Sequence, residues 1–388
     1  MFKKIKNRMG NIYRHYLVSI RNYVKDKPAL GCILKIILRI PTKEFREYVA
    51  RYVPTRTIDG YPCRTRNLRV VSLGDENPNR LILYLERDSG SGGFCAEWIY
   101  WLNRLAFADG IGASFCINWT SSQFYKEKEN VSNTNNIFEY YFQQPGRIKV
   151  KEALKSKNVI FDANIADYGY YDIFAPGRSD DYKMQLSDME AMGVLQGKYI
   201  HLKEGLAVEI DKEIRDLMGN EKVLAVHARG ADANIPYNNH PIPVSAAVYI
   251  EKAKQEARRI GADKIFLATD DNTILKKFLT EFGEKLLYYK AVERSDGLRM
   301  NCYGERARRL HHYHLGREII RDVYTMAYCH GFVCSNSYVS YVVQIVKKSL
   351  NQNFEALYCI HTDFRKKGWN LTDPNTVRRV EEIWNKEL

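Results

Sequence analysis

The stretch Val223-Leu-Ala-Val-His227-Ala-Arg229-Gly230-Ala-Asp232 changes character half-way along. Its first four residues are apolar and rich in valine, which predicts a buried β-strand. Polar residues follow at the carboxyl end, and in an open α/β sheet ligands bind at this edge. His227 and Arg229 stand two residues apart, so in an extended chain they share a face and offer an imidazole and a guanidinium fork suited to phosphate. A surface turn with incidental charges is the alternative interpretation.

The same change from apolar to polar occurs twice more. Lys264–Asp271 ends in Thr-Asp-Asp, and His330–Ser337 ends in Ser-Asn-Ser. Apolar residues at helical spacing lie between and after these segments, over 246–260, 274–282, 319–327 and 339–346. Strands that alternate with helices in this way predict an α/β fold with a parallel, doubly wound sheet. We expect the three polar strand ends to form the rim of one nucleotide site.

The length of 388 residues exceeds what a single hydrophobic core usually supports, so we expect more than one domain. The predicted parts are a basic amphipathic helical arm over 1–50, an α/β domain on the acceptor side over 51–205, a Rossmann-like nucleotide-binding domain over 206–350 and a helical segment over 351–388. Residues 81–119 support the first α/β domain, because they have the pattern strand, glycine-rich turn, helix, strand.

The glycine-rich turn Ser89-Gly-Ser-Gly92-Gly93 follows the first strand of that pattern. Glycines before a helix allow backbone N–H groups to approach a phosphate, so Gly92 and Gly93 are candidate donor-binding residues. A tight structural turn explains the same residues.

Positive charge is concentrated at the N-terminus. Residues 1–70 contain 17 Lys/Arg and 4 Asp/Glu, whereas residues 71–388 contain 42 of each. A neutral body argues against a nucleic-acid groove across it. Apolar residues recur every three or four positions over 2–24, with basic residues off this stripe, which predicts a basic amphipathic helix. Two interpretations stay open: residues 1–40 bind an anionic membrane surface, or the helix docks on the body with its basic face in water.

The eight cysteines are dispersed, without a C-x-x-C pair or the spacing of zinc ligands. This pattern predicts a reducing compartment. The sequence also contains neither a secretory signal nor a run of about 20 apolar residues, which is the length needed to span a membrane. We therefore expect a cytoplasmic protein, with the inner membrane face as its site of peripheral attachment.

Three motifs resemble those of the α-1,6-fucosyltransferases and their bacterial nodulation-factor relatives. His227-Ala-Arg229-Gly-Ala-Asp232, followed by His240-Pro-Ile, is similar to the family's H-x-R-x-x-D…HPI motif. Phe266–Asp271 resembles its second motif, and Arg317–Val323 running on to Phe332–Ser337 resembles its third. The three motifs cover about 222–348, and residues 90–119 match the family's first α/β unit more loosely.

The resemblance implies a GT-B-like fold with two Rossmann-type domains and an inverting, metal-independent glycosyltransferase that uses GDP-fucose or a related GDP-sugar. It places His227 and Asp322 at the guanine base and Arg229 at the β-phosphate. Ser335 and Ser337 would assist at the phosphates, and Asp270 and Asp271 would shape the donor pocket. The implied acceptor is a glycan or a lipid-linked oligosaccharide of cell-surface polysaccharide synthesis.

The chemistry of the residues agrees with this implication. A departing nucleoside diphosphate gains negative charge, which a guanidinium stabilises more in the transition state than in the ground state. With Arg229 in this role no metal is required, and Asp270 and Asp271, being adjacent, point in opposite directions if the chain is extended. No cofactor is therefore expected.

The sequence departs from the family at the general base. The family has a Lys directly after the motif Asp and an acidic residue a few positions on, but here Ala233-Asn-Ile-Pro-Tyr-Asn-Asn follows. Asp232 is the candidate base, with a structural role in the turn as the alternative. Glu293 and Asp296 are further candidates.

Two alternatives to an enzyme stay open because of that departure. One is a non-catalytic protein that binds a nucleotide sugar or glycan on the same scaffold, and the other is a membrane-peripheral assembly protein with a vestigial site. His311-His312-x-His314 raises the possibility of a metal site, but it lacks a carboxylate or cysteine at ligand spacing, which favours a solvated or acceptor-facing loop.

Overall fold

The computed structural model describes residues 56–59, 67–88, 93–161, 186–230, 244–295 and 308–360. The predicted N-terminal arm, 1–50, lies outside these residues. The described residues form two compact units. The first takes its residues from 56–86, 107–117 and 146–161, and the second from 87–106, 118–145 and the chain from 186 onward. In the described part of the chain, no helix has the length and apolar character needed to cross a membrane.

The first unit is built on a small sheet with the strand order β4-β3-β5. β3 (Ile82–Arg87) pairs in parallel with β5 (Val159–Phe161), and β4 (Ser114–Trp119) lies on its other side. Apolar side chains fill the core of this unit, among them Ile82, Tyr84 and Val159, all with 0% exposure. A two-stranded antiparallel ribbon, β1 (Arg56–Asp59) with β2 (Asn67–Val70), precedes it, and the short helix α6 (Val150–Ala153) precedes β5.

The second unit contains a five-stranded sheet in which every neighbouring pair is parallel. Its strands, in spatial order, are β10 (Ala356–Ile360), β9 (Gly331–Ser335), β6 (Val223–His227), β7 (Lys264–Ala268) and β8 (Leu286–Leu287). The apolar run that opens at Val223 is the central strand, and all five of its residues are buried. A parallel strand with both faces covered needs such a continuous apolar run.

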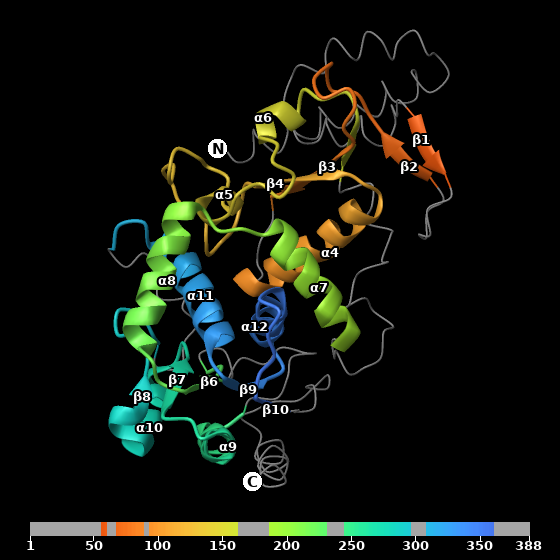
Figure 1. Cartoon of the computed structure of the whole chain (residues 1–388). Helices are drawn as coiled ribbons and strands as arrows, with labels where there is room; N and C mark the ends of the chain where they lie inside the picture. The colour runs from red at the N-terminus through yellow and green to blue at the C-terminus, as the bar shows by residue number, and fades with distance from the viewer. Residues whose placement is uncertain are drawn as a thin grey trace, which may run out of the picture. The chain divides into compact units, whose positions relative to one another are not determined.

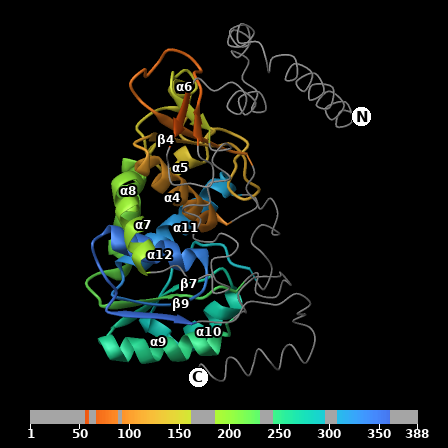
Figure 2. The ribbon, with the colours of Figure 1, turned by 90° about the vertical axis from the view of Figure 1, so that its right-hand side faces the viewer.

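Helices cover both faces of this sheet (Figures 1 and 2). One face carries α9 (Ala246–Ile260) and α10 (Asn272–Phe282), and the other carries α11 (His311–Tyr328) and α12 (Tyr338–Ser349). Two further helices, α8 (Glu204–Met218) and α7 (Leu186–Tyr199), pack on α11 and α12 respectively. The predicted α/β class with parallel sheets is therefore confirmed. The GT-B-like pairing of two Rossmann-type units stays a prediction.

The strand order reverses at β6. From β6 the chain continues on one side of it to β7 and β8, and then returns to its other side to form β9 and β10. The helices that leave two such strands run to opposite faces of the sheet, so a space opens at the carboxyl ends between them. The β6–β9 pair is therefore where ligands bind in sheets of this kind.

Aromatic rings make a second core in this unit, around Phe94 at the start of α4 (Phe94–Gly110). Its ring meets those of Trp98, Tyr125 and Tyr141 edge to face, with centroids 5.1–6.1 Å apart. Tyr141, in the short helix α5 (Phe138–Tyr141), stacks on Tyr313 of α11 and donates a hydrogen bond of 2.9 Å to its carbonyl. Residues 87–106 and 118–145 thereby join the C-terminal half of the chain, across the predicted boundary at 205.

Two predicted elements were wrong, and one helix was not predicted. The segment 351–388 was expected to be helical, but Ala356–Ile360 is β10, because it can extend the sheet by pairing with β9. The segment His311–His314 was expected in a loop, but it forms the first turn of α11, which begins at His311. Residues 186–199 had no predicted structure and form α7, whose Gly193 and Gly197 pack closely on Lys348 and Ser349.

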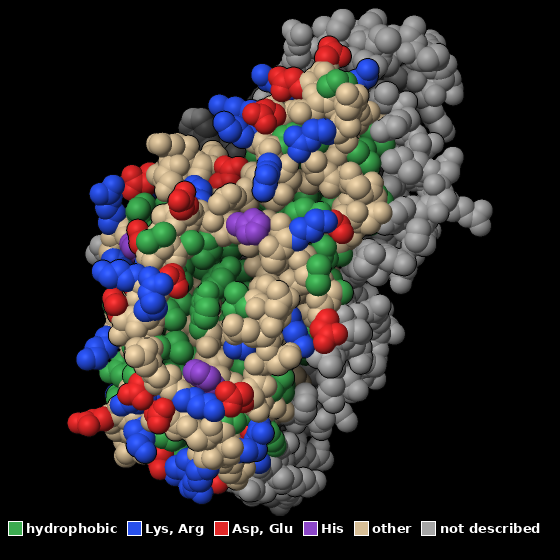
Figure 3. Space-filling view, viewed as in Figure 1, with side chains coloured by type: hydrophobic (Ala, Val, Ile, Leu, Met, Phe, Trp, Pro, Cys, Tyr) green, Lys and Arg blue, Asp and Glu red, His purple; other side chains and the backbone are tan. Residues whose placement is uncertain are grey.

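Charged side chains of both signs are mixed over the described surface that Figure 3 displays. Positive and negative groups alternate there over α9 and α10, and apolar side chains gather over the layer that contains α8, α11 and α12. This mixture agrees with the equal numbers of acidic and basic residues in 71–388.

Gly316→Ala is expected to destabilise the protein by about 1–3 kcal/mol, the usual cost of overpacking. A Cβ at this position of α11 would fall on the Tyr141 hydroxyl, 2.6 Å from its Cζ atom and 3.1 Å from Cε2 of Phe94. Urea denaturation measures the change. Gly205→Ala is the matched control, because a Cβ there on α8 meets nothing within 4 Å. Equal stabilities of the two variants would contradict the packing described.

Candidate functional site

The three polar strand ends predicted from the sequence lie at one edge of the five-stranded sheet. β7 and β9 flank β6, with Ala268 in register with His227 and Val333 in register with Val226. His227, Arg229, Asp270 and Ser335 therefore all belong to the carboxyl ends of three adjacent parallel strands. The predicted convergence of these ends is confirmed, while their donor-binding roles stay predictions.

His227 is the last residue of β6 and is only 9% exposed. Burial, with a smaller contribution from the positive charge of Arg229, lowers the pKa of its imidazole to about 3. The ring is neutral at physiological pH, so one ring nitrogen donates a hydrogen bond and the other accepts one. A neutral imidazole suits recognition of a heteroaromatic base better than it suits a charge contact.

A chain of hydroxyl groups fixes the environment of this ring. The Ser340 hydroxyl donates to the carbonyl of Ser335 at 2.7 Å, so it has no proton left for Ser337. The Ser337 hydroxyl, 2.8 Å from that of Ser340, is accordingly the donor of that pair. His227 Nδ1 lies 3.5 Å from Ser337 Oγ and must supply the proton of this longer contact. The Nε2 atom then presents a lone pair, and it can accept a hydrogen bond from a ligand N–H.

Ser337 also caps α12, because its Oγ accepts a hydrogen bond from the Ser340 N–H at 3.1 Å. The first turn of a helix has unpaired N–H groups and a partial positive charge, both of which favour an anion. Here that helix start follows β9 directly, beside the strand that ends in Arg229. The edge thus combines an amide-rich helix start with a guanidinium.

The two aspartates after β7 face different partners. Asp270 Oδ1 accepts a hydrogen bond of 3.2 Å from the Gly230 N–H, which ties the end of β7 to the chain after β6. Asp271 caps α10, accepting at 2.6 Å from Thr273 N–H and at 3.1 Å from Ile274 N–H. A Cβ on Gly230 would come 2.7 Å from Ile274 Cδ1, so this position requires glycine. Asp271 acts on the site through this cap and close packing.

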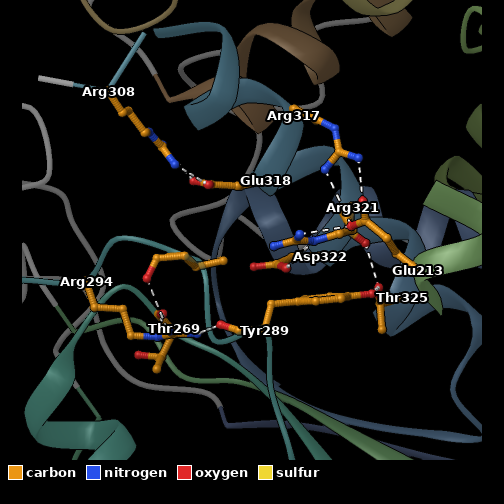
Figure 4. A network of polar contacts seen from close by, with 11 residues as sticks. Glu213, Thr269, Tyr289, Arg294, Arg308, Arg317, Glu318, Arg321, Asp322 and Thr325 are labelled. Atoms are coloured by element: carbon orange, nitrogen blue, oxygen red, sulfur yellow. Dashed lines mark hydrogen bonds and ion pairs between the residues drawn. The ribbon is translucent and has the colours of Figure 1, made fainter. Parts of the chain in front are cut away.

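Asp322, which the family motif placed at the base, lies on α11 in a polar cluster near the end of β7 (Figure 4). Its side chain is 22% exposed, and Oδ1 is buried without a hydrogen-bond partner, 3.9 Å from Arg321 Nε. Burial raises the pKa of the carboxyl to about 6, against the lowering effects of Arg321 and Arg294. A buried acceptor that no protein group satisfies is a feature of sites that wait for a ligand.

Arg321 is held on both sides and still has spare donors. Its guanidinium lies 3.6 Å from the centroid of the Tyr289 ring, and Nη1 donates to Glu213 of α8 at 3.0 Å (Figure 4). Nε and Nη2 are buried without a hydrogen-bond partner. Burial acts to raise the pKa of the Glu213 carboxyl, but the hydrogen bonds from Arg317 and Arg321 outweigh it and hold this pKa below its usual range.

Arg294 organises the loop that follows β8. Its guanidinium donates to the carbonyls of Thr269 (3.1 Å), Val292 (3.2 Å) and Tyr289 (3.0 Å). The same loop carries Glu293, one of the candidate bases, whose Oε2 lies 3.6 Å from His311 Nδ1.

The histidines at the start of α11 contact other parts of the protein: His312 Nδ1 lies 2.8 Å from the Phe124 carbonyl oxygen. Among the described residues, no three His, Cys, Asp or Glu side chains gather as a metal ion requires.

Several predicted residues lie outside the described residues: Asp232, the candidate base, together with Asp296 and Gly92. Gly93 is described and is exposed just before α4. The structure brings Arg294 to Thr269, Arg321 to Asp322 and Ser340 to Ser337, although the sequence did not single out these three residues. Arg294 stands in the segment after β8, and Arg321 and Ser340 stand on helices. Their spacing in the sequence therefore did not show which residues they contact.

No family model matches the sequence, and no curated protein matches it either. Solved structures do match. They include a NodZ α-1,6-fucosyltransferase soaked with GDP-fucose (TM-score 0.41, 13% identity, 69% of this chain and 93% of that one) and fucosyltransferase NodZ from Bradyrhizobium (0.37, 13%, 70% and 92%). POFUT1 in complex with GDP-fucose matches with a TM-score of 0.43 and 14% identity, over 73% of this chain and 99% of that one. Similarities at this level establish neither the family nor the activity.

The free energy of unfolding of Asp322→Asn, relative to that of the wild type, is expected to increase as the pH rises from about 4 to about 6. The pKa of this carboxyl is higher in the folded chain than its ordinary value of 3.8, so folding opposes its ionisation in this window. The difference grows by at most about 1.4 kcal/mol per pH unit and then stays constant. Urea denaturation at several pH values measures it.

Asp216→Asn, at an exposed position on α8, controls for the loss of one negative charge. The account of Asp322 would be refuted by an Asn variant that is less stable than the wild type at pH 7 and equally stable at pH 4.

Proposed function

We propose that the protein is a metal-independent, inverting glycosyltransferase that uses a GDP-sugar, fucose or a related sugar, as donor. The observation that carries the proposal is the meeting of His227, Arg229 and Ser335–Ser337 at the switch point between β6 and β9. These are residues of the first and third motifs that resemble the α-1,6-fucosyltransferases. The resemblance assigns these groups to one donor. They lie about 110 residues apart along the chain, and the fold brings them together.

The chemistry of each group fits a part of a nucleoside diphosphate sugar. Neutral His227 offers a lone pair on Nε2 and Asp322 offers an unsatisfied oxygen, which suit the N–H groups of guanine. Arg229 and the first turn of α12 suit the two phosphates. Guanine is favoured over uracil because it has adjacent N1–H and N2–H donors, which a carboxylate accepts together.

In the reaction, the acceptor hydroxyl attacks the anomeric carbon while the bond to the β-phosphate oxygen breaks. Arg229 stabilises the charge that the departing GDP gains, and the amides at the start of α12 share this charge. A general base removes the acceptor proton. We assign this role to Asp232, with Glu293 as the further candidate on the described chain.

The acceptor side of the proposal rests on the sequence. The basic residues of 1–40 would bring the enzyme to an anionic membrane surface, at the cytoplasmic face, where a lipid-linked oligosaccharide of surface polysaccharide synthesis is the acceptor.

Removal of residues 1–40 should then abolish binding to anionic vesicles while leaving GDP binding intact.

Calorimetric titration with GDP and UDP tests the donor. The wild type should bind GDP more tightly than UDP, and Arg229→Ala should weaken GDP binding by about 1.5–3 kcal/mol, the usual cost of losing a charged hydrogen bond. Arg229→Lys should lose less, because it keeps the charge but not the fork. Arg259→Ala, which removes an exposed arginine of α9, is the control.

Preference for UDP, or binding of neither nucleotide, would refute the proposed donor. GDP binding without hydrolysis of GDP-fucose, and without transfer to any lipid-linked acceptor, would instead indicate a binding protein on the same scaffold.

A further inference from the structure

Tyr249 of α9 is a fully buried tyrosine whose hydroxyl reaches the edge of the sheet that carries the site. Its side chain has 0% exposure and belongs to the apolar core between α9 and the sheet. The hydroxyl donates a hydrogen bond of 2.7 Å to Ser335 Oγ, at the end of β9. It also takes part in a hydrogen bond with the backbone of Arg229, after β6. One side chain of α9 thus connects the ends of β6 and β9 at the switch point.

The direction of these bonds follows from the groups involved. Burial raises the pKa of Tyr249 above its usual range, so the hydroxyl keeps its proton. The hydroxyl has a single proton, which it donates to Ser335 Oγ, so toward the backbone of Arg229 its oxygen can only accept, and that bond runs from the Arg229 N–H. Since the tyrosine proton goes to Ser335 Oγ, the proton of Ser335 is directed elsewhere, and each bond in such a series polarises the next.

Packing alone does not explain a tyrosine here. Phenylalanine has the same ring, and a hydroxyl in an apolar core is unfavourable unless it is hydrogen-bonded. In this fold the hydroxyl contacts the two residues that flank the switch point, Arg229 and Ser335, both of which the site already uses. What the hydroxyl adds is a fixed backbone at Arg229 and a defined donor direction at Ser335.

We infer that Tyr249 is a positioning residue for the diphosphate: through its bonds to Arg229 and Ser335 it sets the guanidinium-bearing backbone and the Ser335 hydroxyl toward the phosphates. This inference rests on the proposed function and deepens it. Tyr249 itself touches neither donor nor acceptor. Its effect should appear in the binding of phosphate groups and not in the binding of the base.

Tyr249→Phe tests the inference by titration with GDP, guanosine and inorganic pyrophosphate. The loss of one buried hydrogen-bonded group should raise the Kd for GDP and for pyrophosphate by about tenfold, and leave the Kd for guanosine unchanged. Tyr141→Phe is the matched control, because it also removes a buried tyrosine hydroxyl, one that donates to the Tyr313 carbonyl at 2.9 Å. Thermal unfolding of both variants shows that they fold.

Ser335 offers a second test if Tyr249→Phe does not fold. Ser335→Ala should give the same selective loss of phosphate binding, and Ser335→Thr, which keeps a hydroxyl, should restore it.

The outcomes separate the inference from the proposed function. A Tyr249→Phe variant that binds GDP like the wild type, or that loses guanosine and GDP equally, overturns the inference and leaves the function standing. A wild type that prefers UDP overturns the guanine donor, and the pyrophosphate titration then still decides the role of Tyr249. A wild type that binds neither pyrophosphate nor a nucleotide overturns both.

Discussion

The parallel pairing of β6 with β7 on one side and β9 on the other is the constraint on which the site depends. The strand order reverses at β6, so the chain segments that follow β6 and β9 part from one another at their carboxyl ends. That geometry is available only because Val223–Val226 is apolar on both faces, as a central strand under two helix layers must be. Polar residues can then occur only where the strand stops, and this is where His227 and Arg229 stand.

Polar groups at such a buried edge must find partners, and the partners are what shape it. Ser340, Ser337 and His227 form one series of contacts, and Tyr249 and Ser335 form another, both at the β6–β9 junction. On the β7 side, Asp270 binds the Gly230 N–H. Each bond satisfies a buried group and at the same time fixes a donor or acceptor direction, so packing and recognition depend on the same atoms.

In the cluster around Asp322, by contrast, some buried polar groups have no hydrogen-bond partner. Arg321 is anchored by Glu213 and stacked on Tyr289, while two of its nitrogens and one oxygen of Asp322 lack hydrogen-bond partners. Unsatisfied buried groups lower the stability of the folded chain, and α8 and α11 compensate through the bonds of Glu213 to Arg317 and Arg321. Buried polar groups without hydrogen-bond partners are a feature of sites that bind a ligand.

The sequence by itself determined the α/β class, the central strand and the three polar strand ends, because apolar runs and helical spacing are local properties that burial imposes directly. It also singled out His227, Arg229 and Ser335–Ser337, which the structure brings to one edge of the sheet, while their roles in donor binding stay predictions. It missed β10, since an edge strand is defined by the neighbour it pairs with, and it missed Tyr249, whose position in a helical stripe resembles that of any core residue. Only the tertiary structure decided the neutral state of His227, the capping role of Asp271 and the link from Tyr249 to Ser335. These depend on burial and on contacts between residues up to 110 positions apart, which no local pattern records.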